Sequence, residues 1–239
     1  MRTAPLDRDA SDLTGRARIR DAAITCFATE GFGASVRTIA ERAGVSPGLI
    51  THHFGSKDAL RAACDAEVLD RYQHLKADGV ADPSGQLLSH LAVPGPAATV
   101  LVYLLRALHA GGAPARAFLD RLLDTLRPVV ATTVASGLVR PSRDEEARIR
   151  YLTEQSMGGM LVHFLLAPDQ TPDAFVASLH ERQRDTILPA LELFTEGLLT
   201  DRTVLDDYVA QLPDAPDAPD APDAPAAPDA PHAPDAPHA

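Results

Sequence analysis

The strongest constraint on the fold is a series of helix start and stop signals between residues 14 and 60. Gly31 and Gly44 each follow a run of apolar residues at helical spacing, and glycine readily adopts the left-handed backbone that ends a helix. Ser35, Ser46 and Ser56 each precede the next run, and serine is a preferred N-cap residue. The signals predict one helix over about 14–30, two short helices, and a fourth helix that begins after residue 56.

The remainder of the chain shows helical periodicity and no convincing strand alternation. Tryptophan is absent and aromatic residues make up only 5% of the chain, which favours helices over sheets. We expect further helices from residue 82, over 97–110, over 114–136, over 142–166, and from 172 to about 199. Pro128 and Pro189 are expected to break or kink two of them, and Ser142 and Glu145 have capping-box spacing. The predicted fold class is therefore all-α.

The two ends of the chain differ from its middle. Residues 1–13 mix charges without an apolar core, so we expect a flexible arm there. Residues 213–239 form nine triplets of the Pro-Asp-Ala type, and proline at every third position excludes helix and sheet. We expect a disordered, solvated tail. Between the ends we predict a helix-turn-helix domain over 14–60 and a larger helical domain over 61–212.

Charge is distributed unevenly along the chain. The net charge of −11 would by itself argue against a nucleic-acid partner. Residues 14–58, however, carry six basic and four acidic groups, so this segment is +2 and the rest of the chain is −13. A mildly basic module on an acidic body is compatible with DNA binding. With only two cysteines, no signal peptide and no long apolar stretch, we expect a soluble cytoplasmic protein.

The segment around residue 44 has the length of a helix-turn-helix motif, whose tight turn often holds a glycine. Gly44 can end the second helix at low cost, and Val45 is expected to turn inward. Ser46 and Pro47 then restart the chain at a steep angle. A third helix that projects in this way fits the major groove of B-DNA, with its N-terminal residues nearest the bases.

Residues 22–60 resemble the tetracycline-repressor (TetR/AcrR) family of bacterial regulators. The resemblance rests on Ala22-Ala23 through Phe27, Gly31-Phe32, Ile39-Ala40, Ala43-Gly44-Val45-Ser46, Gly48, Ile50, His53-Phe54, Ser56-Lys57 and Leu60. It implies a homodimeric repressor that binds a palindromic operator and is released by a small-molecule effector. By motif position, the residues expected to face DNA are Arg37, Thr38, Ser46, Pro47, Gly48, Thr51, His52 and Lys57. Thr51 stands where family members commonly have tyrosine, which shortens or moves an expected phosphate contact.

The resemblance also implies dimerisation and ligand binding in the domain over 61–212. The end of the 142–166 helix is apolar on nearly all sides, which suits a helix buried against both its own domain and a partner. The expected interface residues are Met157, Met160, Leu161, Phe164, Leu191, Phe194 and Leu198. An ordinary monomer core is the alternative interpretation of the same residues.

The candidate ligand-binding residues are polar groups inside apolar helical runs, because such groups need a hydrogen-bonding partner. They are Tyr103, Arg106, His109, Tyr151, Gln155 and His163. Each could equally be a structural hydrogen-bonding group within the protein.

Other function classes find little support in the sequence. There is no Gly-x-Ser-x-Gly elbow, phosphate-binding glycine loop or His-Glu-x-x-His pair, so we expect no enzyme activity, cofactor or metal. Cys26 and Cys64 are expected to be buried packing residues. Two alternatives to the regulator stay open: a ligand-binding helical protein whose head no longer binds DNA, and a helical enzyme. The sequence also leaves repression and activation both open.

Overall fold

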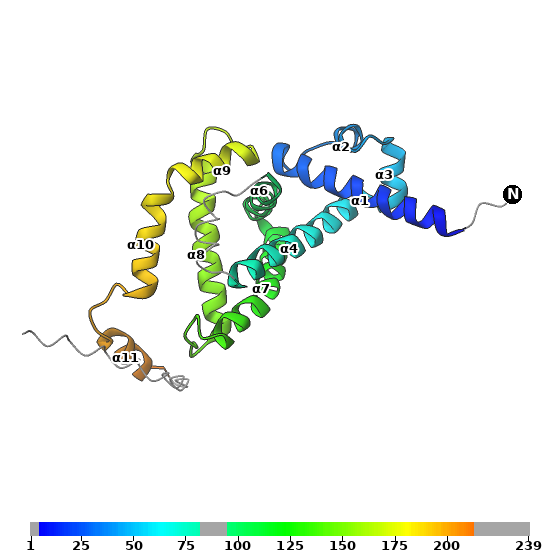
Figure 1. Ribbon diagram of the computed structural model, residues 1–239. Coiled ribbons are helices and arrows are strands. Elements are labelled where there is room, and N and C mark those ends of the chain that lie inside the picture. The colour runs from blue at the N-terminus through cyan, green and yellow to red at the C-terminus, as the bar shows by residue number, and fades with distance from the viewer. Residues whose placement is uncertain (1–4, 82–94, 213–239) are drawn as a thin grey trace, which may run out of the picture.

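A computed structural model describes residues 5–81 and 95–212, which contain helices and no strand and so confirm the all-α prediction. The helices, shown in Figure 1, are α1 (Pro5–Glu30), α2 (Val36–Ala43), α3 (Pro47–Phe54), α4 (Lys57–Ala81), α6 (Gly95–His109), α7 (Gly112–Ala135), α8 (Glu145–Leu166), α9 (Pro172–Glu181), α10 (Gln183–Thr195) and α11 (Thr203–Ala210). Among these described helices, none has the length and apolarity needed to span a membrane.

Helices α1, α2 and α3 form a small N-terminal head around buried apolar side chains. Ile19 and Phe27 of α1 meet Ile39 of α2 and Ile50 of α3 in its core, and each is at most 2% exposed. In α2, buried Ile39 and Ala40 share the inward face. This amphipathic spacing leaves the opposite faces of α2 and α3 free for solvent or a partner.

Helix α4 leaves the head and enters the larger C-terminal body, as Figure 1 shows. It packs against α7, while α6 lies in the middle of the body and contacts α1, α4, α7, α8 and α9. The hydrophobic core continues from the head into the body, where Tyr103, Phe118, Phe164 and Phe175 are its largest members. The expected boundary at residues 60 and 61 therefore falls inside one continuous helix.

Helices α10 and α11 lie at the edge of the molecule (Figure 1). Helix α10 packs chiefly against the end of α9, and most of its side chains are exposed. They include large apolar ones such as Leu188 (61% exposed) and Phe194 (71%). These exposed side chains form an apolar surface on α10.

Several helix boundaries differ from the predictions. Helix α1 begins at Pro5, so residues 5–13 belong to a helix although an arm was predicted. Proline is well tolerated in the first turn, which makes Pro5 a suitable start. Helix α7 is not interrupted at Pro128. The helix predicted from 172 to about 199 is two helices, separated at Arg182, and Pro189 lies within the second.

Two further differences concern capping and coverage. Asp144 is the N-cap of α8, since its carboxylate accepts a hydrogen bond from Ala147 N at 2.9 Å. Glu145 reaches back to Ser142 N at 2.8 Å, so only half of the predicted capping box forms. Helix α11 was not predicted. The helix expected from residue 82 and the tail over 213–239 lie outside the described residues.

Candidate DNA-binding surface and ligand pocket

Helix α2 begins with the predicted serine cap. The Ser35 hydroxyl accepts a hydrogen bond from Thr38 N at 3.0 Å, which satisfies one of the free amides of the first turn. Arg37 follows with its side chain 84% exposed, and it pairs with Glu41 across one turn at 3.0 Å. An exposed pair of this kind contributes only about 0.3–0.5 kcal/mol, so Arg37 can exchange it for another anion.

The turn between α2 and α3 has the backbone that the glycine was expected to supply. Gly44 has φ 65° and ψ 39°, in the left-handed region. Val45 N donates to Ala40 O at 3.0 Å and Gly44 N to Glu41 O at 3.2 Å, the pair of bonds of a Schellman motif. Arg18 of α1 donates to Ala43 O, a further carbonyl at this helix end. The turn thereby fixes the angle between the two helices.

Helix α3 presents its first turns to solvent. Ser46 occupies the N-cap position and Pro47 the first turn, as expected, but the Ser46 hydroxyl makes no capping bond. Ile50 and Phe54 point into the core, whereas Pro47, Gly48, Thr51 and His52 are exposed. The outward face of α3 thus carries few hydrogen-bond donors.

The start of α4 adds a cation and a free helix N-terminus. Ser56 caps this helix, with Ala59 N donating to its hydroxyl at 3.0 Å. Lys57 is half-buried, and within the described part of the chain its ammonium has no carboxylate at ion-pair distance. The positive end of the helix dipole and this cation together suit a phosphate.

All eight residues predicted to face DNA are exposed or half-buried in the head, and none belongs to its core. His53, one of the residues that carry the family resemblance, is half-buried. Its ring lies beside Gly15 of α1, so His53 serves the packing of the head.

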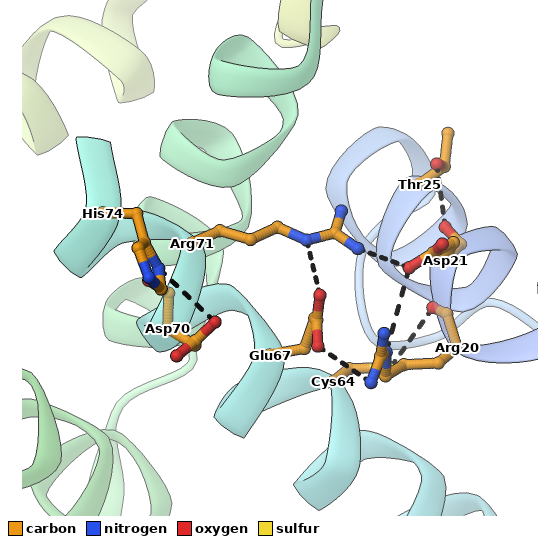
Figure 2. A network of polar contacts seen from close by, with 8 residues as sticks. All are labelled: Arg20, Asp21, Thr25, Cys64, Glu67, Asp70, Arg71 and His74. Carbon is orange, nitrogen blue, oxygen red and sulfur yellow. Dashed lines mark hydrogen bonds and ion pairs between the residues drawn. The ribbon is translucent and has the colours of Figure 1, made fainter. Parts of the chain in front are cut away.

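An ion network fastens α4 to α1, as Figure 2 shows. Glu67 of α4 receives Arg20 Nη1 at 2.8 Å and Arg71 Nε at 2.8 Å. Arg71 Nη2 also donates to Asp21 of α1 at 2.5 Å. Burial lowers the pKa of Arg71, but the hydrogen bonds to Glu67 and Asp21 outweigh it and raise the pKa overall. These contacts join α4 directly to the first helix of the head.

Arg106 of α6 forms a second junction between body and head. Its Nε donates to Ala28 O at 2.7 Å and its Nη2 to Thr29 O at 3.1 Å, at the C-terminal end of α1. Its guanidinium also lies 5.4 Å from the ring centroid of Phe164 in α8. Gly31 has φ 83°, and a Cβ there would lie 3.5 Å from Arg106 Nη1. Burial lowers the pKa of Arg106. This predicted ligand residue thus has a structural position at the junction.

Tyr103, another predicted ligand residue, is fully buried in a polar link between three helices. Its hydroxyl donates to Asp65 Oδ1 of α4 at 2.7 Å, and Arg121 of α7 donates to Asp65 Oδ2 at 2.9 Å. Burial and the nearby Asp65 carboxylate raise the pKa of Tyr103, so it stays a hydrogen-bond donor. The link holds α4, α6 and α7 together.

The other predicted ligand residues lie apart from one another. His163 hydrogen-bonds to Ser178 of α9 at 3.0 Å, while His109, Tyr151 and Gln155 are exposed. The structure therefore does not bring the six candidates together in one pocket.

A pocket of about 190 Å³ lies between α4, α7 and α8 and contains none of those six residues. Its lining is mostly apolar, with two cations and three side chains that carry a hydroxyl: Tyr72, Lys76, Leu126, Val130, Arg148, Ile149, Leu152, Thr153, Ser156, Met157 and Met160. Sequence reasoning missed this site because its three helices are far apart in the chain. One signal was available, since Thr153 lies on a helical stripe that is otherwise apolar (Ile149, Met157, Phe164).

The predicted interface residues divide into two groups. Met157 and Phe164 are buried in the protomer's own core, and Met160 and Leu161 are half-buried against it. Only one face of α8 is buried in the protomer. We expected this helix to be buried on two sides, but its outer face is exposed in the protomer. Leu191, Phe194 and Leu198 are exposed, by 42%, 71% and 84%.

Both cysteines are free and buried, as predicted. Burial raises the pKa of Cys64 to about 12 and raises that of Cys26 as well. Both side chains are thus neutral thiols near neutral pH. In the described residues, no three His, Cys, Asp or Glu side chains are grouped so as to hold a metal ion.

Two family profiles match this chain. Residues 19–64 match the profile described as bacterial regulatory proteins, tetR family, and residues 97–200 match that of a tetracyclin repressor-like C-terminal domain. The first match covers the head together with the start of α4. The second covers most of the body.

Similar whole proteins point the same way. The chain is 39% identical over 204 residues to the HTH-type transcriptional regulatory protein RaaS of Mycobacterium tuberculosis, covering 84% of this chain and 95% of that protein. It is 29% identical over 168 residues to the HTH-type transcriptional repressor KstR2 of Rhodococcus jostii, covering 64% and 81%. A crystal structure from Rhodococcus sp., assigned to the TetR family, superposes with a TM-score of 0.51 at 22% identity. It covers 72% of this chain and 97% of that one, and it shows the shared fold.

Proposed function

Since this chain belongs to the TetR family of bacterial transcriptional regulators, we propose that it is a homodimeric repressor released from its operator by a small molecule. The repressor direction is supported by the relative KstR2, whose name states it. We place the protein in the cytoplasm with its DNA, and assign it no enzymatic activity.

In this proposal α3 enters the major groove and the start of α4 meets the phosphate backbone. Lys57 and the α4 N-terminus bind a phosphate, while Arg37 leaves Glu41 for the DNA. Thr51 and His52 are the exposed side chains of α3 with donor or acceptor groups for base edges. Because so few side chains are available to contact base edges, DNA shape is expected to contribute to sequence preference.

Dimerisation would join the outer face of α8 to α10 of both protomers in a four-helix arrangement. Gly158 and Gly159 are exposed on α8, and no atom lies within 4 Å of a Cβ added to either. Val162 on α8 and Phe194 on α10 are exposed by 59% and 71%. Small residues beside large apolar ones allow close approach of a second helix.

The observation that carries the ligand response is that α4 both starts at the DNA-facing surface and lines the pocket. Lys57 and Lys76 lie 19 residues apart on one unbroken helix, a span of about 28 Å at 1.5 Å per residue. Glu67, between them, fastens the same helix to α1. A ligand that binds the pocket more tightly in one position of α4 would shift the spacing of the two heads.

The test is a fluorescence-anisotropy titration against DNA from upstream of the protein's own gene, at several salt concentrations. Wild type should bind saturably and more weakly as salt rises, because binding releases counterions. Lys57→Ala should weaken binding and reduce the salt slope by about 1. Arg116→Ala, which removes an exposed charge from α7, is the control and should leave both unchanged.

If the protein binds the upstream DNA no more tightly than random DNA, the next step is to select binding sites from a pool of random DNA sequences. If that selection also recovers no site, the alternative of a ligand-binding protein with a DNA-inactive head replaces the proposal.

A further inference from the structure

The pocket between α4, α7 and α8 combines apolar walls with the positive charges of Lys76 and Arg148. No carboxylate lines it. Arg148 already donates to Glu145 at 2.5 Å and to Arg140 O, so its charge has a partner. Lys76 is half-buried with its ammonium 5.3 Å from the Tyr72 ring centroid, and no carboxylate of the described residues pairs with it. A partly desolvated ammonium that no described carboxylate pairs with favours an anionic ligand.

The same pocket also contains the hydroxyl of Thr153. Thr153 is 7% exposed, and its hydroxyl makes no hydrogen bond with the described residues. Other threonines in the helices donate to the carbonyl four residues earlier: Thr25, Thr29, Thr125, Thr132, Thr186 and Thr195. The Thr153 hydroxyl can therefore donate a hydrogen bond to a bound molecule.

The size of the pocket limits the apolar part of that molecule. A cavity of about 150 Å³ lined by aliphatic and aromatic side chains can hold benzene. A volume of about 190 Å³ therefore suits one aromatic ring or a short alkyl chain with a small polar group. A larger hollow of about 470 Å³ lies between α1 and α4, but its lining carries the Arg20–Glu67 ion pair and it belongs to the head.

We propose that the effector is a small amphipathic carboxylate whose anionic group binds Lys76 and accepts a hydrogen bond from Thr153. Its apolar body packs among Leu126, Ile149 and Met157. The inference names the ligand class for the ligand-responsive regulator proposed above and rests on that proposal for its biological consequence. Binding itself, however, can be measured without DNA.

The experiment is isothermal titration calorimetry of the full-length protein with 3-phenylpropionate and with 3-phenylpropionamide, which share one body and differ in charge. Wild type should bind the carboxylate at least about tenfold more tightly than the amide, since hydrogen bonds to charged groups are the stronger ones. Lys76→Met should abolish this preference. Thr153→Val should weaken carboxylate binding about threefold to tenfold.

Arg150→Met is the matched control. Arg150 is exposed on α8, pairs with Asp120 of α7 and Glu154 of α8, and does not line the pocket. It should bind the carboxylate as wild type does. Thermal melts confirm that each variant is folded. Equal binding of acid and amide, no binding of either, or an unchanged preference in folded Lys76→Met would overturn the inference.

The DNA titration with 3-phenylpropionate separates this inference from the proposed function. Carboxylate binding that depends on Lys76 but leaves DNA affinity unchanged supports the ligand class and contradicts the ligand-released repressor. DNA binding by a protein that takes up neither compound supports the regulator and overturns the ligand class.

Discussion

At the level of single residues, the turn between α2 and α3 depends on Gly44. Its φ of 65° lies where an L-residue costs about 1–2 kcal/mol. We expect Gly44→Ala to lower the free energy of unfolding by that amount, measured by urea denaturation at one fixed protein concentration. Gly33→Ala is the control: its φ lies outside the left-handed region and no atom lies within 4 Å of the added Cβ. Equal loss of stability in both variants would contradict the assignment of strain to Gly44.

The buried thiols give a second prediction at this level. The raised pKa of Cys64, about 12, means that the folded protein favours the neutral thiol. This contribution to stability is complete below the ordinary thiol pKa of about 8.5 and is lost as pH rises toward the folded-state value. At pH 8 we therefore expect a thiol reagent to label neither Cys26 nor Cys64 in the folded chain and both in denaturant. Rapid labelling of folded protein would instead indicate an accessible, reactive cysteine.

At the level of elements, the ion network of Figure 2 joins α4 to α1. Glu67 is 20% exposed and holds two guanidinium groups, of which Arg20 belongs to α1. Asp70, three residues later, is 63% exposed and pairs only within α4, with His74. Glu67→Gln should lower the free energy of unfolding by about 1 kcal/mol, and Asp70→Asn by less than about 0.5 kcal/mol, because exposed pairs contribute little. Urea denaturation at pH 7 compares the two, and the loss in Glu67→Gln should shrink in 1 M salt. A loss as large in Asp70→Asn would contradict the special position of Glu67.

Helix ends in the head could be predicted from the sequence because their causes are local. Ser35 and Ser56 make the capping bonds expected of them, and Gly44 has the left-handed backbone. Each feature depends on a few neighbouring residues, which a sequence shows directly. The predicted DNA-facing residues came instead from the family resemblance, and they are exposed or half-buried on α2, α3 and the start of α4.

The elements and sites that escaped prediction depend on distant parts of the chain. Arg182, with φ −93° and ψ 2°, separates α9 from α10. It is neither glycine nor proline, so the residue type at this position does not predict a helix end. The pocket requires α4, α7 and α8 to meet, and the hydroxyl of Thr153 is significant only once its neighbours are known. Polar residues within apolar runs were a poor guide, because Tyr103 and Arg106 already have partners inside the protein.

At the level of the whole molecule, one core runs from the head through α4, α6, α7 and α8 to Phe175 of α9. Helix α10 lies beyond it, joined mainly through α9 and rich in exposed apolar side chains. Complete burial of one such side chain contributes about 1.5–3 kcal/mol to stability. A protomer on its own lacks this contribution for the exposed side chains of α10. A second copy of the chain, with its own α8 and α10, can supply the missing surface by two-fold symmetry.

Phe194 is the sharpest test of this arrangement, since it is 71% exposed on α10 and aromatic side chains often dominate interfaces. A charge at its position would have to be buried without a partner in the dimer. We expect Phe194→Glu to raise the dimer dissociation constant at least about thirtyfold, which corresponds to about 2 kcal/mol. Sedimentation velocity over a range of protein concentrations measures this constant. Leu138→Glu is the control, because Leu138 is also exposed, by 54%, but lies in the connection between α7 and α8. Its dissociation constant should match wild type. A Phe194→Glu protein that sediments as the wild-type dimer would exclude α10 from the interface. The two N-terminal heads would then have to be held together by another surface of the protein.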